Sequence, residues 1–95
     1  MNIVWRPMAI ADRERIFDYI AQDNPLAALQ LDEEFAAKAQ AAARQPTLYK
    51  PGRVPGTREI VVRPNYILVY KVQQGGAVLV VLRVLHAAQQ WPQQP

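Results

Sequence analysis

TREIVVRPNYILVYKV, residues 57–72, is the stretch that decides the fold. It holds two runs rich in β-branched and aromatic residues, separated by the turn-forming pair Pro64-Asn65. Such runs joined by a short turn predict a β-hairpin. A third apolar run follows a turn whose Gly75 and Gly76 can take positive φ. The predicted strands are 57–63, 66–72 and 77–86, which together form a three-stranded antiparallel sheet over residues 57–86.

Residues 8–44 carry the apolar spacing of two α-helices, at intervals of three and four. Asn24 can cap a new helix, and Pro25 suits its first position because the amide there has no partner. So short a link predicts an antiparallel hairpin that buries the apolar side of each helix, its stripe, against the sheet. Asp12 is expected away from the first stripe. The stripes are Ala9, Ile16, Phe17 and Ile20, then Ala28, Leu31, Phe35, Ala39 and Ala42.

The remaining segments complete one domain over residues 1–95, a length that supports a single core. Residues 1–6 are β-prone, and we expect this first strand to join the sheet. Residues 47–56, with their prolines and glycines, predict an ordered loop, and residues 87–95 predict a polar tail outside the sheet. The expected fold class is α+β, a βααβββ chain with an antiparallel sheet and an N-terminal helical hairpin on one face.

The composition excludes several kinds of site. The chain has no cysteine and no serine, which removes disulfides, thiolate metal sites and the commonest nucleophile of acyl transfer. A single histidine cannot hold a metal alone, and GRVPG lacks the lysine and hydroxyl of a phosphate-binding loop, so we expect no metal and no cofactor. No apolar run is long enough for a membrane span and no leader is evident, so we expect a cytoplasmic protein without a membrane partner.

The net charge of +3 is unevenly distributed along the chain. Residues 1–44 hold five bases and seven acids, a net of −2, whereas residues 45–95 hold six bases and Glu59, a net of +5. A basic half suits an acidic partner, either a phosphate backbone or an acidic protein segment. Scattered solubilising arginines explain the same count equally well.

Arg83 and His86 stand near the end of the last strand. In a regular strand Val84 and His86 share one face with Val80 and Leu82, while Arg83 shares the other with Val81 and Leu85. Arg83 and His86 can therefore act together only if the strand bends, bulges or ends near Leu85. A lone histidine among apolar neighbours is more often structural than a general base.

Other candidate side chains do not form one stripe either. Arg58 and Arg63 are expected on opposite faces of their strand, because their spacing is odd. Tyr66 and Tyr70 share a face of the next strand, where aromatic residues serve either the core or a contact surface. For these two tyrosines the core is the favoured interpretation.

The chain resembles the RelE/ParE superfamily of bacterial type II toxins over nearly its whole length. The resemblance lies in the helical hairpin with its Asp-Asn-Pro break, Gly56 with Arg58 and Glu59, and the Pro-Asn-Tyr turn at 64–66. Val-Tyr-Lys-Val at 69–72 and Arg-Val-Leu-His at 83–86 complete it. It implies a βααβββ toxin that causes growth arrest, as in plasmid stabilisation modules, and a cognate antitoxin that neutralises it.

Two targets are compatible with this fold, so the fold does not choose between them. Ribosome-dependent mRNA endoribonucleases of RelE type carry basic side chains where this chain has Val61, Ile67 and Ala87, none of which can move a proton. The ending and the Pro-Asn-Tyr turn are more similar to the ParE branch, which poisons DNA gyrase without catalytic residues. The resemblance then implies target contacts by Arg58, Arg63, Tyr70, Arg83, His86 and Trp91.

The alternative is a RelE-like nuclease acting on the ribosome and mRNA, with Arg58, Tyr70, Arg83 and His86 as candidate residues. A third possibility is a binding module without toxicity. In each case we expect an antitoxin along the hairpin and the sheet edge, touching Trp5 and Phe35 where they are exposed. Toxin–antitoxin pairs of this type often form hetero-oligomers, and electrostatic complementarity would speed their association.

Overall fold

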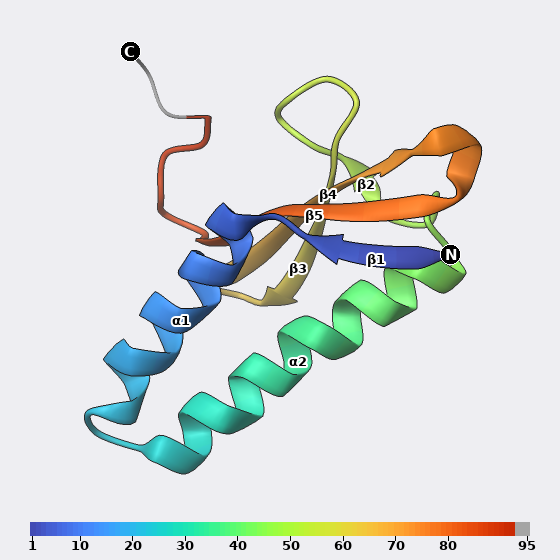
Figure 1. Cartoon of the computed structure of the whole chain (residues 1–95). Helices are drawn as coiled ribbons and strands as arrows, with labels where there is room; N and C mark the ends of the chain where they lie inside the picture. Colours follow the sequence, from blue (N-terminus) through green and yellow to red (C-terminus); the bar gives the residue numbers. More distant parts are fainter. Residues whose placement is uncertain (93–95) are drawn as a thin grey trace.

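The computed structural model describes residues 1–92, so residues 93–95 of the predicted tail lie outside the described residues. Two helices form a hairpin against one face of a sheet, while the loop before β3 and the C-terminal segment rise on the other side (Figure 1). The elements are β1 (Asn2–Trp5), α1 (Pro7–Ala21), α2 (Pro25–Arg44), β2 (Lys50–Pro51), β3 (Arg58–Arg63), β4 (Tyr66–Gln73), the 3₁₀ turn Gln74–Gly76 and β5 (Val78–His86).

The sheet has five strands in the order β1-β5-β4-β3-β2. The three predicted strands form its antiparallel centre, as expected. β1 joins this sheet, as expected, and makes it mixed, because β1 lies parallel to β5 with Ile3 opposite Leu79. The long connection that a parallel pair needs is here the helical hairpin followed by β2, β3 and β4. The short β2 lies inside the segment predicted as a loop and pairs with the start of β3.

The helix predictions are largely confirmed. Asn24 caps α2, its side-chain oxygen accepting a hydrogen bond of 3.0 Å from the amide of Ala27, and Pro25 is the first helical residue. All five residues of the α2 stripe are buried, among them Phe35, which is fully enclosed and offers nothing to a partner. In α1 the expectation for Asp12 was wrong, since this carboxylate lies on the buried side of the helix with Ala9.

Apolar side chains pack on both faces of the sheet. The larger core lies between the sheet and the helices and holds Leu31, Phe35 and Tyr70. A smaller cluster of Ile67, Val69 and Leu85 lies on the opposite face, which we call the open face. This second cluster explains why the central strands carry few polar positions.

β5 contains a bulge at Leu82. Tyr70 pairs with Val81 and Val69 pairs with Arg83, so Leu82 is one residue more than β4 can match. The strand therefore departs from regular alternation, as the sequence left open, because the bulge resets which face each residue takes. Val81 and Val84 both pack in the helix-side core.

No helix among residues 1–92 is long and apolar enough to cross a membrane.

Candidate functional site

The six residues expected to contact a target lie at three separate places. Arg58 and Tyr70 face each other across β3 and β4. Arg63 and His86 line one crevice. Arg83 lies beneath the ring of Trp91. The residues that we expected on one surface thus lie in three separate pairs, and each pair has different contacts.

The first pair is structural. The Tyr70 side chain is fully buried and its hydroxyl donates a 2.5 Å hydrogen bond to the carbonyl of Pro46. Burial raises the pKa of Tyr70, although the nearby charge of Arg58 acts in the opposite direction. Arg58 donates a 2.6 Å hydrogen bond to the carbonyl of Tyr49. Both side chains hold the chain between α2 and β3, so the expected target contact by Tyr70 does not fit its position.

Arg83 is the centre of an ion pair that the sequence did not reveal. Its guanidinium donates to the carboxylate of Asp12 through Nε at 2.7 Å and Nη2 at 2.9 Å. The amide of Val84 and the guanidinium of Arg15 donate to the same carboxylate, at 2.9 Å and 2.6 Å. Four hydrogen bonds therefore compensate the burial of Asp12, whose side chain is 2% exposed.

This arrangement shifts two pKa values in opposite directions. Burial alone would raise the pKa of Asp12, but the hydrogen bonds from Arg83, Val84 and Arg15 outweigh it and lower the pKa below the usual 3.8. The hydrogen bond from Arg83 to Asp12 raises the pKa of the guanidinium against the effect of its own burial. Both shifts favour the charged forms of the two groups, so Arg83 is poorly suited to proton transfer.

Trp91 covers Arg83 from the open face of the sheet. The guanidinium carbon of Arg83 lies 5.5 Å from the centre of the indole ring, a cation–π distance. The ring also packs against the cluster of Ile67, Val69 and Leu85. Trp91 is therefore partly a cover for this second core.

The third pair forms a crevice at the far end of the strands. Tyr66 pairs across the sheet with both Arg63 and His86, and its ring lies 5.5 Å from the imidazole. Nδ1 of His86 accepts a hydrogen bond of 3.1 Å from the amide of Ala88, so the neutral ring carries its proton on Nε2. Arg63 forms an ion pair with Glu34 of α2. Other lining residues include Arg15, Tyr19 and Asn65.

Within residues 1–92, the open face offers no pair of groups for acid–base chemistry. Val61 is exposed there opposite Ile67, and Ala87 is exposed just beyond β5. Glu59 is the carboxylate of this face, but it is buried and accepts a 2.9 Å hydrogen bond from the amide of Arg53. Among residues 1–92, no three histidine, aspartate or glutamate side chains gather as metal ligands would.

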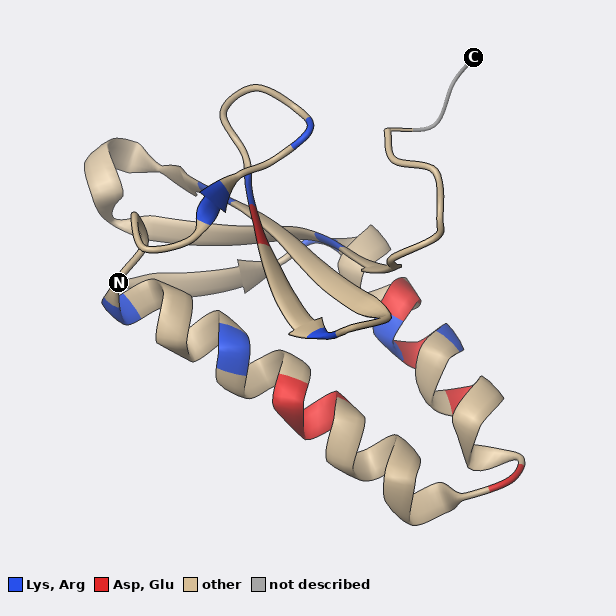
Figure 2. Cartoon of the chain, turned by 180° about the vertical axis from the view of Figure 1, so that it is seen from behind, with Lys and Arg blue, Asp and Glu red and all other residues tan. Residues whose placement is uncertain are grey.

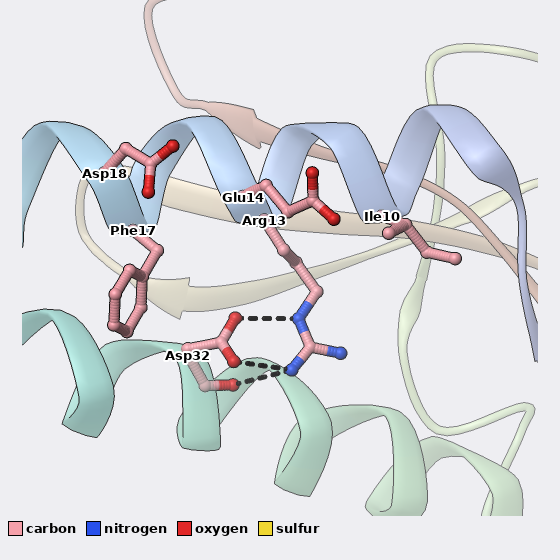
Figure 3. A pocket seen from close by; sticks show the side chains of 6 residues that line it. All are labelled: Ile10, Arg13, Glu14, Phe17, Asp18 and Asp32. Carbon is pink, nitrogen blue, oxygen red and sulfur yellow. Dashed lines mark hydrogen bonds and ion pairs between the residues drawn. The ribbon is translucent and has the colours of Figure 1, made fainter.

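A hollow between the two helices is lined mainly by α1. Ile10, Phe17, Glu14 and Asp18 border it, and Arg13 crosses it to Asp32 of α2 (Figure 3). Nε and Nη2 of Arg13 each donate to this carboxylate at 2.8 Å. The same guanidinium lies 4.4 Å from the centre of the Trp5 ring. One side chain therefore connects β1, α1 and α2.

The charge asymmetry of the sequence is also an asymmetry in space. Every carboxylate residue except Glu59 lies on α1, α2 or the turn between them (Figure 2). The sheet and its loops carry the excess of bases. A partner that covers both parts must therefore meet an acidic and a basic surface.

Comparison with known proteins identifies the family. Residues 3–91 match the family described as the ParE toxin of the type II toxin–antitoxin system, parDE. This chain belongs to the ParE toxin family. It is thus a type II toxin of the RelE/ParE superfamily, as the resemblance of its motifs implied.

The proteins similar to this ParE-family chain include one named after RelE and one named after ParE. It is 35% identical to the putative toxin Y4kP of Sinorhizobium fredii, over 97% of this chain and 94% of that protein. It is 36% identical to the toxin RelE2 of Caulobacter vibrioides, over 92% of this chain and 96% of that protein. The structure resembles the chromosomal ParDE toxin–antitoxin system of P. aeruginosa, with a TM-score of 0.77, 21% identity and coverage of 90% and 95%. This last likeness shows the shared fold.

Proposed function

We propose that this toxin arrests growth by binding DNA gyrase and trapping it on cleaved DNA, without covalent chemistry of its own. The supporting observation is that three of its candidate side chains are occupied by hydrogen bonds within the fold. Arg83 is held by Asp12, and the side chains of Arg58 and Tyr70 each donate to a backbone carbonyl. Side chains committed in this way stabilise a rigid surface and are poorly suited to move protons.

The proposed contact surface lies where β5 ends. Arg63 and His86 are the members of the expected set that solvent can reach there, and the exposed Ala87 and Ala88 follow directly. Arg53, on the loop before β3, adds a positively charged side chain that is 42% exposed on the open face. A surface of this charge suits a target that acts on DNA, because it attracts phosphate as well as acidic protein segments.

A supercoiling assay with purified components tests this proposal. We expect stoichiometric amounts of the toxin to inhibit gyrase and to increase the fraction of cleaved plasmid. The matched control is the toxin preincubated with its antitoxin, which should leave both readouts at the level of gyrase alone. Unimpaired supercoiling at a large excess of folded toxin would contradict the proposal.

A RelE-like mRNA endoribonuclease is the second candidate, and the crevice at His86 is the observation that favours it. Nε2 of His86 carries a proton in the neutral ring, Tyr66 lies beside it, and Arg63 supplies a positive charge. A histidine, a tyrosine and an arginine are groups that can donate protons or stabilise a phosphorane. Primer extension on translated messages after induction would show codon-positioned cuts if this candidate holds.

We further infer that a cognate antitoxin neutralises the toxin and forms a hetero-oligomer with it. The name of the ParDE system, whose fold this chain shares, supports a paired partner. The hollow between α1 and α2 offers apolar contacts at Ile10 and Phe17 among carboxylates, so the segment bound there should be apolar with basic flanks. Coexpression with the product of the neighbouring gene, followed by light scattering, tests the assembly. Both proposed targets place the toxin in the cytoplasm.

A further inference from the structure

The C-terminal segment, residues 87–92, folds back over the open face of the sheet. Its turn is set by His86, whose carbonyl accepts a 2.8 Å hydrogen bond from the amide of Gln89. Trp91 is the side chain from beyond the strands that packs on this face. The apolar residues it contacts are called the open-face patch and comprise Ile67, Val69, Leu82 and Leu85.

The closed position of this segment contains a polar defect. Nε1 of Trp91 is buried and has no hydrogen-bond partner among the described residues. A buried donor without an acceptor destabilises the state that contains it. The carbonyl of Trp91 accepts a hydrogen bond from Arg53 at 3.5 Å, the long limit for such a bond. The segment is therefore held mainly by the ring, and its hold is weaker than that of a core element.

The surroundings of the ring show which ligand chemistry this surface accepts. The Arg83 guanidinium lies against the indole, and an aromatic ring is the group that such a cation favours. A hollow beside the ring is lined by Arg6, Met8 and Arg83. Arg53 stands at another part of the rim. The carboxylates that face these cations, Asp12 and Glu59, are themselves buried, so the exposed rim is basic.

We propose that the open-face patch binds an extended acidic segment of a protein partner through one aromatic side chain, and that residues 87–92 occupy this surface in the free chain. The partner's ring takes the place of Trp91 over Arg83. Its carboxylates reach Arg6 and Arg53 at the rim. A phenylalanine ring would bring no unpaired N–H, which removes the defect of the closed position. The proposal goes beyond the poisoning of gyrase and does not depend on it.

Fluorescence of the full chain tests the displacement. The sequence contains two tryptophans, so Trp5→Phe leaves Trp91 as the single reporter. The probe is an acidic copy of residues 86–92, His-Ala-Asp-Glu-Glu-Phe-Pro, and the matched control is the neutral His-Ala-Ala-Gln-Gln-Phe-Pro. We expect the acidic peptide to shift the Trp91 emission to the red and to increase its quenching by acrylamide. The neutral peptide should require a clearly higher concentration.

Labelled peptide and three further full-length variants complete the test. Trp91→Ala should bind the acidic peptide about tenfold more tightly, because the competing segment no longer occupies the surface. Arg53→Gln should weaken binding about fivefold, while Arg44→Gln, on the helix behind the sheet, should leave it unchanged. The anisotropy of the labelled peptide reads these affinities even if Trp5→Phe fails to fold.

Several outcomes would overturn the proposal. They are an unchanged Trp91 emission at saturating peptide, equal affinity of Trp91→Ala and the parent chain, and equal affinity of the two peptides. Displacement by a single-stranded oligonucleotide in place of the peptide would assign the surface to phosphate. Concentration-dependent burial of Trp91 without peptide would assign it to a second copy of the chain.

Discussion

Asp12 of α1 and Arg83 of β5 form a bidentate ion pair, with 2.7 Å and 2.9 Å between the guanidinium nitrogens and the two carboxylate oxygens. The pair joins the first helix to the strand that precedes the C-terminal segment. It lies beneath Trp91 and beside the bulge at Leu82. Both the position of α1 and the course of β5 beyond the bulge therefore depend on one carboxylate.

Asp12→Asn should destabilise the fold by about 3–5 kcal/mol, because it leaves the charge of Arg83 buried without its partner. Urea unfolding monitored by circular dichroism measures the change. Asp18→Asn, an exposed carboxylate on the same helix, should alter stability by less than about 0.5 kcal/mol. Equal effects of the two variants would contradict the structural importance of the pair.

Stability should fall on the acid side of pH 3.8 through this same group. The pKa of Asp12 is lower in the folded state than its ordinary 3.8, so its contribution is complete well above that pH and is lost as the pH falls toward the folded-state pKa. Thermal unfolding between about pH 7 and pH 2 measures this decrease in stability. The loss of stability between neutral and acid pH should be smaller in Asp12→Asn. An identical loss in that variant would show that other carboxylates cause it.

Tyr70→Phe should cost about 1–3 kcal/mol of stability and leave toxicity intact below the melting temperature, because the hydroxyl serves the carbonyl of Pro46 and not a target. Differential scanning calorimetry and growth after induction at a low temperature measure the two effects. Tyr19→Phe, whose parent side chain is exposed, is the matched control for the change in stability. A stable but non-toxic Tyr70→Phe chain would restore Tyr70 to the functional surface.

His86→Gln should retain growth arrest if gyrase is the target, because glutamine keeps hydrogen-bonding groups but cannot exchange a proton near neutral pH. If the chain cuts messages, the same variant should lose about 10²-fold or more of its cleavage rate. Gyrase inhibition and primer extension on the same preparation distinguish the two results. Gln40→Ala, at an exposed position of α2 that does not line the crevice, controls for loss of expression.

The periodic parts of the fold could be predicted from the sequence. The stripe from Ala28 to Ala42 was confirmed because helical spacing alone determines which side of α2 is apolar. The cap at Asn24 is equally local, since asparagine is favoured at the N-cap of a helix and proline at its first position. The positive φ of Gly75 and Gly76 was confirmed for the same reason.

The nonlocal parts could not be predicted. The parallel partner of β1 and the bulge at Leu82 depend on how β5 meets its two neighbours, which no short window of sequence contains. Asp12 was assigned to the exposed side because a carboxylate is rarely buried unless it is paired. Its partner Arg83 is distant in sequence, and only an arginine isolated within an apolar strand hinted at a buried acid.

The division of the candidate site has the same origin. Alternation correctly placed Tyr66 and Tyr70 on one face, in the helix-side core. It could not show that Tyr66 stands between Arg63 and His86, because this depends on the register of two strand pairs. The hydrogen bonds from Arg58 and Tyr70 to backbone carbonyls likewise have no recognisable pattern in the sequence.

The pairing of β1 with β5 constrains when this toxin becomes active during synthesis. Residues at the very start of the chain obtain their partner only after Val78–Val81 have been made. Such a contact between distant parts of the chain closes late in folding, because the loop it encloses is nearly the whole protein. A ribosome-bound nascent chain thus carries its helices without a finished sheet. We therefore expect the folded sheet, and with it the toxin's surface, only after β5 has been synthesised.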